Sequence, residues 1–174
     1  MRLNGRKIIL RVVEEIDSAF ILSLRVDETK NKFLSNVEAD PDKQIEWVRS
    51  YKLRELAGDE YYFIITSLDG ESCGTVRLYD FQGDSFCWGS WLIKNGSPPS
   101  AGIESALLVY ELAFYQLGFS RSHFDVRSDN VKVRAFHERM GAQRLRENEL
   151  ECHYTYSKIT YEKIRSKYSK YLPA

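Results

Sequence analysis

The chain has 174 residues, with 25 Lys and Arg against 25 Asp and Glu, and 43% of its residues are hydrophobic. A chain of this size is expected to form one domain, residues 1–174, whose core needs neither a disulfide framework nor a metal. The zero net charge argues against a nucleic-acid-binding protein, because such a protein usually carries a strong basic excess. No apolar run reaches the roughly 20 residues of a membrane span, and no secretory signal is evident, so we expect a cytoplasmic protein with no membrane partner.

The cysteines, Cys73, Cys87 and Cys152, are odd in number and widely spaced. This pattern predicts reduced core residues rather than disulfides. Cys152 and His153 are adjacent, and no second pair of ligands completes a tetrahedral zinc site, so we expect no metal.

The first half of the chain alternates between the two periods of regular structure. We expect a strand at 7–13, a helix at 17–26 and a second helix after Asp40-Pro41, where proline suits the first turn. A meander of three strands should follow, at 61–67, 71–79 and 85–93, with a tight turn at Asp69-Gly70 joining the first two.

In the second half, apolar residues recur at intervals of three and four from 102 to 117, which predicts a helix that ends at Gly118. A short strand is expected at 122–127, then a helix from about 129 to 140 that stops at Gly141. A hairpin over 143–156 and a last helix over 160–172 complete a mixed α and β chain.

One sequence motif carries most of the information about function. The strand at 122–127 leads to Asn130, a small residue follows at Val133, and the next helix closes with Phe136-His137-Glu138-Arg139-Met140-Gly141. With the order of elements around it, this motif resembles the GNAT superfamily of acetyl-CoA-dependent N-acetyltransferases, in particular its ribosomal-protein and amino-sugar branches. The resemblance covers nearly the whole chain.

The resemblance implies an α+β (mixed α/β) fold: a mostly antiparallel, twisted sheet of six to seven strands, flanked by about four helices, with splayed strands at the cofactor cleft. It also implies acetyl-CoA as co-substrate, bound through the strand before the central helix, the start of that helix, and the motif. The residues implied are Trp91, Leu92, Ile93, Ser100, Ala101, Gly102, Ile103, Glu104, Ser105, Asn130, Phe136 and Arg139.

A helix N-terminus suits the pyrophosphate of CoA, because its free N–H groups and dipole attract anions. The family pattern Gln/Arg-x-x-Gly-x-Gly/Ala aligns with Pro99 at its first position and Glu104 at its last, and only Gly102 is kept. A carboxylate at Glu104 would repel the pyrophosphate unless it points away. The alternative is that residues 97–100 form an ordinary surface turn.

Two residues are candidates for catalysis. Asp125 lies five residues before Asn130 on the outward face of its strand, where the resemblance implies a carboxylate base that deprotonates the amine, directly or through water. The alternative for Asp125 is a salt bridge to Arg127 or to a neighbouring strand.

His137 follows Asn130 by seven residues, where many members of the family have a tyrosine that protonates the departing thiolate. An imidazole could take that role, since its pKa is closer to neutral than that of a phenol. The alternatives are contact with the cofactor without proton transfer, or simple packing.

The predicted reaction is direct attack of a small amine on the thioester in a ternary complex. The first choice of acceptor is an amino sugar or an amino acid, and the alternatives are a protein N-terminus or a non-catalytic GNAT-like binding domain. The partners are therefore a small amine and CoA, in a monomer or homodimer. Candidates for acceptor contacts, by location only, are Asp27, Glu28, Asn31, Glu151, His153 and Tyr154.

The C-terminal segment 158–174 carries five basic residues and one acidic residue. We expect a solvated amphipathic helix packed on the domain, and the alternative is a docking surface for an anionic partner.

Overall fold

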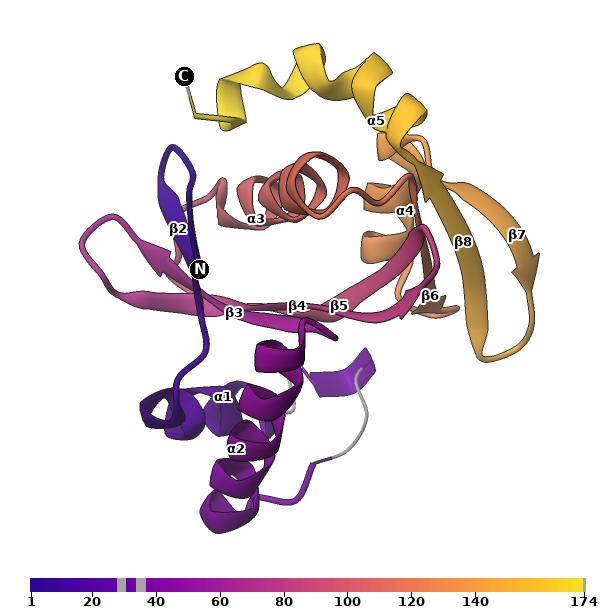
Figure 1. Ribbon diagram of the computed structural model, residues 1–174. Coiled ribbons are helices and arrows are strands. Elements are labelled where there is room, and N and C mark those ends of the chain that lie inside the picture. Colours follow the sequence, from indigo (N-terminus) through magenta and orange to yellow (C-terminus); the bar gives the residue numbers. More distant parts are fainter. Residues whose placement is uncertain (28–30, 34–36, 174) are drawn as a thin grey trace.

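The computed structural model describes residues 1–27, 31–33 and 37–173. In this part of the chain, one sheet has eight strands in the order β1-β2-β3-β4-β5-β6-β8-β7 (Figure 1). Neighbours are antiparallel except β5 and β6. The strands are β1 Arg2–Asn4, β2 Ile8–Val12, β3 Tyr61–Ser67, β4 Ser72–Gln82, β5 Ser85–Ile93, β6 Arg121–Arg127, β7 Gln143–Glu147 and β8 Glu151–Ser157.

The predicted mixed α/β fold with a mostly antiparallel sheet is confirmed, with one strand more than expected. That strand is β1, a segment of three residues that pairs with β2 in register Leu3 to Leu10. So short a segment has no periodicity of its own, and it becomes a strand because β2 offers an unpaired edge.

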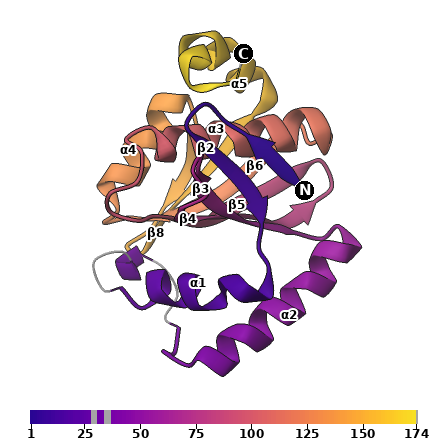
Figure 2. The same ribbon diagram turned by 90° about the vertical axis from the view of Figure 1, so that its left-hand side faces the viewer.

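The helices lie on both faces of the sheet (Figures 1 and 2). On one face lie α1 and α2, and on the other lie α3, α4 and the C-terminal segment. Their bounds are α1 Ser18–Arg25, α2 Pro41–Ala57, α3 Ala101–Glu111, α4 Val131–Met140 and α5 Lys158–Arg165.

The ends of the helices follow the capping residues in the sequence. Asp40 accepts hydrogen bonds from the N–H groups of Asp42 and Lys43, and Pro41 begins α2. Asn130 accepts from the N–H of Val133 at the start of α4, and Gly141 ends α4 with φ +96°. Beyond α3 the chain continues as a π-helical turn, Leu112–Gln116, so the helical segment predicted at 102–117 is present with a wider last turn.

The strands β5 and β6 separate soon after they meet. They pair in parallel only at Ser85 with Arg121 and at Phe86 with Ser122. Farther along, β5 keeps its partner β4 while β6 pairs with β8 over its whole length, from Arg121 to Arg127. The predicted splayed pair of strands is therefore present, and β5 exposes an edge beyond Phe86 that no described strand occupies.

A bulge interrupts β5 a few residues beyond its last pairing with β6. The register with β4 shifts between Gly89 and Leu92, and Ser90 has φ +48°. Thr75 donates a hydrogen bond of 2.8 Å to the carbonyl of Ser90, which holds this unusual conformation in place.

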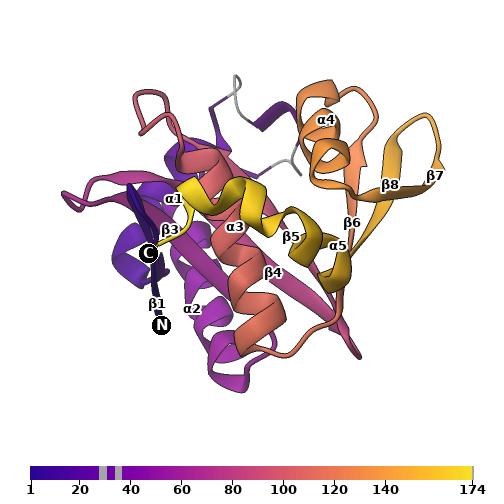
Figure 3. The same cartoon turned by 90° about the horizontal axis from the view of Figure 1, so that it is seen from above.

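The C-terminal segment lies across α3 (Figure 3). Its regular helix, α5, is shorter than the predicted 160–172, and Ser166–Tyr171 is a 3-10 helix. Tyr161, Tyr168 and Leu172 are buried, and the hydroxyl of Tyr161 donates a 2.6 Å hydrogen bond to Glu111 of α3. The apolar face of the segment is thus packed on the domain, and its lysines are exposed.

A buried carboxylate joins the N-terminal hairpin to α3. Glu104 is 1% exposed, and one of its oxygens accepts hydrogen bonds of 2.9 Å from the N–H groups of Arg6 and Lys7 in the β1–β2 turn. Its other oxygen accepts a 2.6 Å bond from the hydroxyl of Ser100. The carboxylate lies in the first turn of α3, where the helix dipole favours a negative charge.

We expect Glu104→Ala to lower the free energy of unfolding by about 2–4 kcal/mol, because two main-chain donors and the Ser100 hydroxyl would lose a charged, buried acceptor. Ser100→Ala, which removes one neutral donor, should cost only about 1 kcal/mol. Urea unfolding of both variants measures the difference, and equal losses would contradict this role of the carboxylate.

Candidate active site

A cavity of about 1090 Å³ opens where β5 and β6 separate. It extends from the gap between these strands to the helices α1 and α2 on the far side of the sheet. Two ends can be distinguished by their side chains: an aromatic and apolar end between the strands, and a polar end toward α1 and α2.

The aromatic end is lined by Trp88 and Trp91 of β5, Phe124 and Val126 of β6, and Val133 of α4. These rings contact one another, with 5.3 Å between the centroids of the two tryptophans. An apolar channel beside an unpaired strand edge suits an extended chain that carries amide groups, because the edge offers main-chain partners while the rings exclude water. The pantetheine arm of CoA has this chemistry.

The residues predicted to bind this arm lie on the open edge. Trp91 faces the cavity, whereas the side chain of Leu92 is buried. Toward β4, Leu92 pairs with Thr75 and Ile93 with Gly74. These residues can therefore offer a ligand the main-chain N–H and C=O groups that face β6.

The start of α3 lies against Trp91. A side-chain carbon placed on Gly102 would approach the indole ring of Trp91 to 3.6 Å. The N–H of Ala101 donates to the carbonyl of Pro98, and that of Glu104 to the carbonyl of Ser100. The N–H groups of Gly102 and Ile103, in the first turn, have no carbonyl partner by position and remain as donors for an anion.

Three predicted cofactor contacts need correction. Both oxygens of the Glu104 carboxylate accept hydrogen bonds from within the protein, from Arg6 and Lys7 N–H and from the Ser100 hydroxyl, so this side chain is not a contact for a pyrophosphate. The hydroxyl of Ser100 is bonded to Glu104. Ser105 is fully buried, where it accepts a 3.0 Å hydrogen bond from the indole N–H of Trp91, so it positions that ring instead of contacting a ligand.

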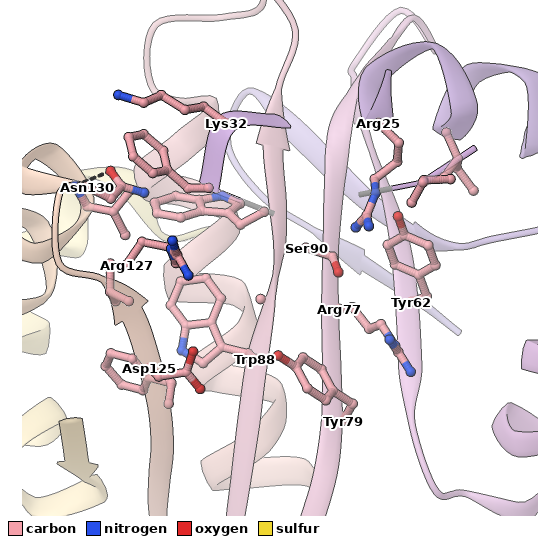
Figure 4. A pocket seen from close by; sticks show the side chains of 18 of the residues that line it. Arg25, Lys32, Tyr62, Arg77, Tyr79, Trp88, Ser90, Asp125, Arg127 and Asn130 are labelled. Carbon is pink, nitrogen blue, oxygen red and sulfur yellow. Dashed lines mark hydrogen bonds between the residues drawn. The ribbon is translucent and has the colours of Figure 1, made fainter. Parts of the chain in front are cut away.

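The residues predicted on α4 are divided between two places. Asn130 lines the cavity, and its amide oxygen caps the helix by accepting a hydrogen bond from Val133 N–H (Figure 4). Phe136 packs on Trp91, with 5.2 Å between ring centroids. Arg139 is exposed and lies outside the cavity, beside the C-terminal segment.

Asp125 faces the cavity from β6, with its carboxylate toward the hydroxyl of Tyr79 (Figure 4). Among the residues that the structure describes, neither Asp125 nor Arg127 has an ion-pair partner, so the alternative of a salt bridge between them is wrong. Burial and the nearby thiol of Cys87 raise the pKa of Tyr79, and the charge of Asp125 adds to this effect. Tyr79 is therefore a protonated hydroxyl, and Asp125 is the group on this wall that can accept a proton.

His137 is 4% exposed and is surrounded by the rings of Trp88, Phe124 and Phe136. This burial lowers the pKa of His137 from 6.5 to about 3, and its Nδ1 has no hydrogen-bond partner in the described part of the chain. The expectation of a pKa suited to proton donation near neutral pH is wrong. His137 is a neutral imidazole on the cavity wall, able to give or accept a hydrogen bond there.

The polar end of the cavity is lined by charged side chains, some of them in ion pairs: Arg77 with Glu60, Lys43 with Glu38 and Lys32 with Asp129. Five Lys or Arg and three Asp or Glu residues line the cavity as a whole. The pKa of Arg25 on α1 is lowered, mainly because its side chain is largely buried. The positive charge of Arg77 on β4 is near enough to lower it further. Arg127 points into the middle of the cavity from the opposite wall (Figure 4).

The sequence did not identify Arg25 and Arg77, because they come from distant elements with no common motif. Arg127 had a signal, its shared strand face with Asp125. Of the residues predicted from location, Glu151 lines the cavity. His153 pairs with Asp125 across β6 and β8 but does not line it.

Two other predictions from location are not supported. Tyr154 is buried on the opposite face of β8, where its hydroxyl donates to Glu138, so it is not a contact for the acceptor. Asp27 follows α1 and is absent from the cavity wall. Glu28 and the side chain of Asn31 lie outside the described residues.

Comparison with known proteins gives the arrangement a context. A family model described as an acetyltransferase (GNAT) domain matches residues 7–143. A solved structure described as apo FdhC, a nucleotide-linked sugar GNAT, is 44% identical, with 99% of each chain covered and a TM-score of 0.91. No curated protein sequence matches the chain.

More distant solved structures share the fold. One is a spermidine N-acetyltransferase from Vibrio cholerae in complex with CoA and spermine, at 17% identity, covering 90% of this chain and 98% of that one, with a TM-score of 0.75. Another is a putative ribosomal-protein-serine acetyltransferase from Vibrio cholerae, at 15% identity, covering 90% and 97%, with a TM-score of 0.72.

Two features are absent from the described residues. No helix in this part of the chain has the length and apolar character to cross a membrane. No cluster of three or more His, Cys, Asp or Glu side chains in it is arranged to hold a metal ion.

The buried neutral imidazole of His137 makes a specific contribution to the pH dependence of stability. Between pH 6.5 and pH 3 the unfolded state binds a proton at this residue and the folded state does not, so stability falls as the pH is lowered through this range. From pH 7 to pH 5 the loss from this residue is about 2 kcal/mol. Both proteins lose unfolding free energy between pH 7 and pH 5. We expect this loss to be about 2 kcal/mol smaller in His137→Phe than in the unchanged protein.

Urea unfolding at pH 7 and pH 5 measures this difference. Phe124→Leu is the control, because it disturbs the same cluster without removing a titrating group. An equal pH dependence in His137→Phe and the unchanged protein would show that the imidazole is not held neutral.

Proposed function

We propose that this chain, which belongs to the GNAT acetyltransferase family, transfers an acetyl group from acetyl-CoA to the primary amine of an amino sugar linked to a nucleotide. The observation that carries the acceptor class is Arg127, which points into the cavity and has no ion-pair partner in the described part of the chain, with Arg25 and the Glu60-paired Arg77 on the opposite wall. A nucleotide-linked sugar carries a diphosphate, whose negative charges such a cation would attract. The relative at 44% identity is described as a GNAT for such sugars, which supports the same class.

A polyamine acceptor fits the cavity less well. The fold is shared with spermidine acetyltransferases, but at 17% identity that likeness concerns the fold alone. A polyamine is a polycation, and in this cavity it would meet Arg25, Arg77 and Arg127. Arg77 is paired with Glu60, but Arg127 has no ion-pair partner in the described part of the chain and would repel a polycation.

The cofactor is proposed from the aromatic channel, the open edge of β5 and the two free N–H groups of α3. The main chain of β5 beyond Phe86 would bind the pantetheine arm, and Gly102 and Ile103 would bind the pyrophosphate. Asn130 lines the same cavity, and its amide nitrogen would be available to the cofactor because its oxygen caps α4. The acetyl group would then lie near Asp125, where the channel meets the polar end.

Asp125 would act first, by accepting a proton from the ammonium form of the acceptor, directly or through one water. The free amine would attack the thioester carbonyl, the carbon–sulfur bond would break as the tetrahedral intermediate collapses, and the new amide nitrogen would lose its second proton to solvent. Free thiols have pKa values near 8.5, so the thiolate can leave without a strong acid and take its proton from solvent. The neutral His137 would contribute by donating a hydrogen bond to the sulfur as negative charge develops.

A covalent enzyme intermediate is not part of the proposal. Cys87 is the cysteine that Asp125 influences electrostatically, and burial raises the pKa of its thiol to about 11. Such a thiol stays protonated at neutral pH and is a poor nucleophile. The amine therefore attacks the thioester directly.

We expect Asp125→Asn to lower kcat/KM for the acceptor by about 100-fold at pH 7, the usual size of a general-base contribution. The loss should shrink as the pH rises, because the free amine then forms without the base. Asp129→Asn, an exposed carboxylate four residues farther along the chain, is the control. A loss that does not depend on pH would rule out the role of base.

The acceptor class is tested by a thiol-release screen with acetyl-CoA against nucleotide-linked amino sugars, free amino sugars, polyamines, amino acids and peptides. We expect turnover of the nucleotide-linked sugars, and Arg127→Gln should raise KM for them about tenfold with little change in KM for acetyl-CoA. Arg146→Gln, on β7 away from the cavity, removes the same charge and should have no effect. Activity on polyamines or peptides alone would overturn the proposed acceptor.

A further inference from the structure

A second, smaller cavity of about 240 Å³ lies between α4, the start of α3 and the C-terminal segment. Ile103 comes from α3, Phe136 and Arg139 from α4, and Lys167, Lys170 and Tyr171 from the segment. The family model ends at residue 143, so half of this wall is built by residues outside the matched region. We call this cavity the tail groove.

The charge of the tail groove has one sign. Three of its lining residues are basic and none is acidic. Arg139, Lys167 and Lys170 have no ion-pair partner in the described part of the chain. By contrast, Arg165 in the same segment is bonded to Glu111 at 2.6 and 3.0 Å. Three cations without a counter-charge, gathered at one depression, favour an anion of more than one charge.

The position of the tail groove relates it to the active site. Phe136 lines the groove and packs on Trp91, which lines the large cavity. Ile103 lines the groove and carries one of the two free N–H groups of the first turn of α3. A ligand that leaves the large cavity past Trp91 and crosses the start of α3 therefore arrives at Lys167, Lys170 and Arg139.

We infer that the C-terminal segment is part of the cofactor site and that the tail groove binds the 3′-phosphate of CoA. This inference rests on the proposed use of acetyl-CoA. Acetyl-CoA carries a pyrophosphate and, on the ribose beyond it, one further phosphate. The helix terminus accounts for the first, and the tail groove supplies cations for the second. The ring of Tyr171, with the Lys170 ammonium 4.9 Å from its centroid, forms a further part of this wall.

The inference explains why the segment is both packed and basic. Tyr161, Tyr168 and Leu172 hold it on the domain, and this fixes the exposed lysines at one end of α3. The alternative of a solvated helix without function would leave no reason for three unpaired cations to converge there. The sequence also allowed a docking surface for an anionic partner at this segment. In the present inference that partner is the 3′-phosphate end of the cofactor.

Calorimetric titration with CoA and with 3′-dephospho-CoA tests the inference, because the two ligands differ only in this phosphate. We expect the unchanged protein to bind CoA at least tenfold more tightly. In the double variant Lys167→Gln, Lys170→Gln this preference should fall to within about twofold, with the affinity for dephospho-CoA unchanged. Lys163→Gln, Arg2→Gln removes two exposed charges elsewhere and should keep the preference.

Two outcomes would overturn the inference. One is equal affinity of the unchanged protein for the two ligands, which leaves the proposed acetyl transfer intact. The other is an equal loss of both affinities in the double variant at unchanged unfolding free energy. A protein that binds neither ligand at millimolar concentration would instead refute the proposed function itself, so the two failures can be told apart.

Discussion

The separation of β5 from β6 is the constraint on which the rest of the site depends. A parallel pair that continued in register would satisfy every main-chain group and leave no room for a ligand. Here the pair lasts for two registers, and then each strand follows a different partner, β5 following β4 and β6 following β8. The bulge at Ser90, held by Thr75, interrupts β5 a few residues farther along. The unpaired edge is therefore maintained by the hydrogen bonds of the outer strands.

The chemical character of the side chains changes along the space between the strands. Toward α4 the wall is aromatic, and its dry surroundings keep His137 neutral. Toward α1 and α2 the wall is charged, with Asp125 at the boundary. A thioester needs the first environment and an anionic acceptor needs the second, so the carboxylate stands where the two substrates would meet.

Much of the fold could be predicted from the sequence because it depends on local periodicity. The meander, the helix at 102–117 and the caps at Asp40, Asn130 and Gly141 are signals within a few residues of the elements they control. The direction of Glu104 could not be predicted. It depends on β1, a strand of three residues, which places the N–H groups of Arg6 and Lys7 beside α3.

The site divides in the same way. Asp125 and Asn130 were identified because one strand and one helix cap place them on the cavity wall. Arg25 and Arg77 could not be identified from the sequence, because only the folded sheet brings α1 and β4 together. The pKa of His137 depends on Trp88 and Phe124, which come from strands that are distant in sequence.

The zero net charge of the chain hides an uneven distribution of its charged side chains. Among the cations without an ion-pair partner in the described residues are Arg127 in the large cavity and three side chains in the tail groove. Acidic residues such as Glu104 and Glu111 are used inside the structure to hold the N-terminal hairpin and the C-terminal segment. Glu104 is bonded to main-chain N–H groups and a hydroxyl and not to a cation, so its charge is not used in an ion pair. A neutral chain can thus present positive surfaces at both ends of its ligand path, and the anions that compensate them would be those of its substrates.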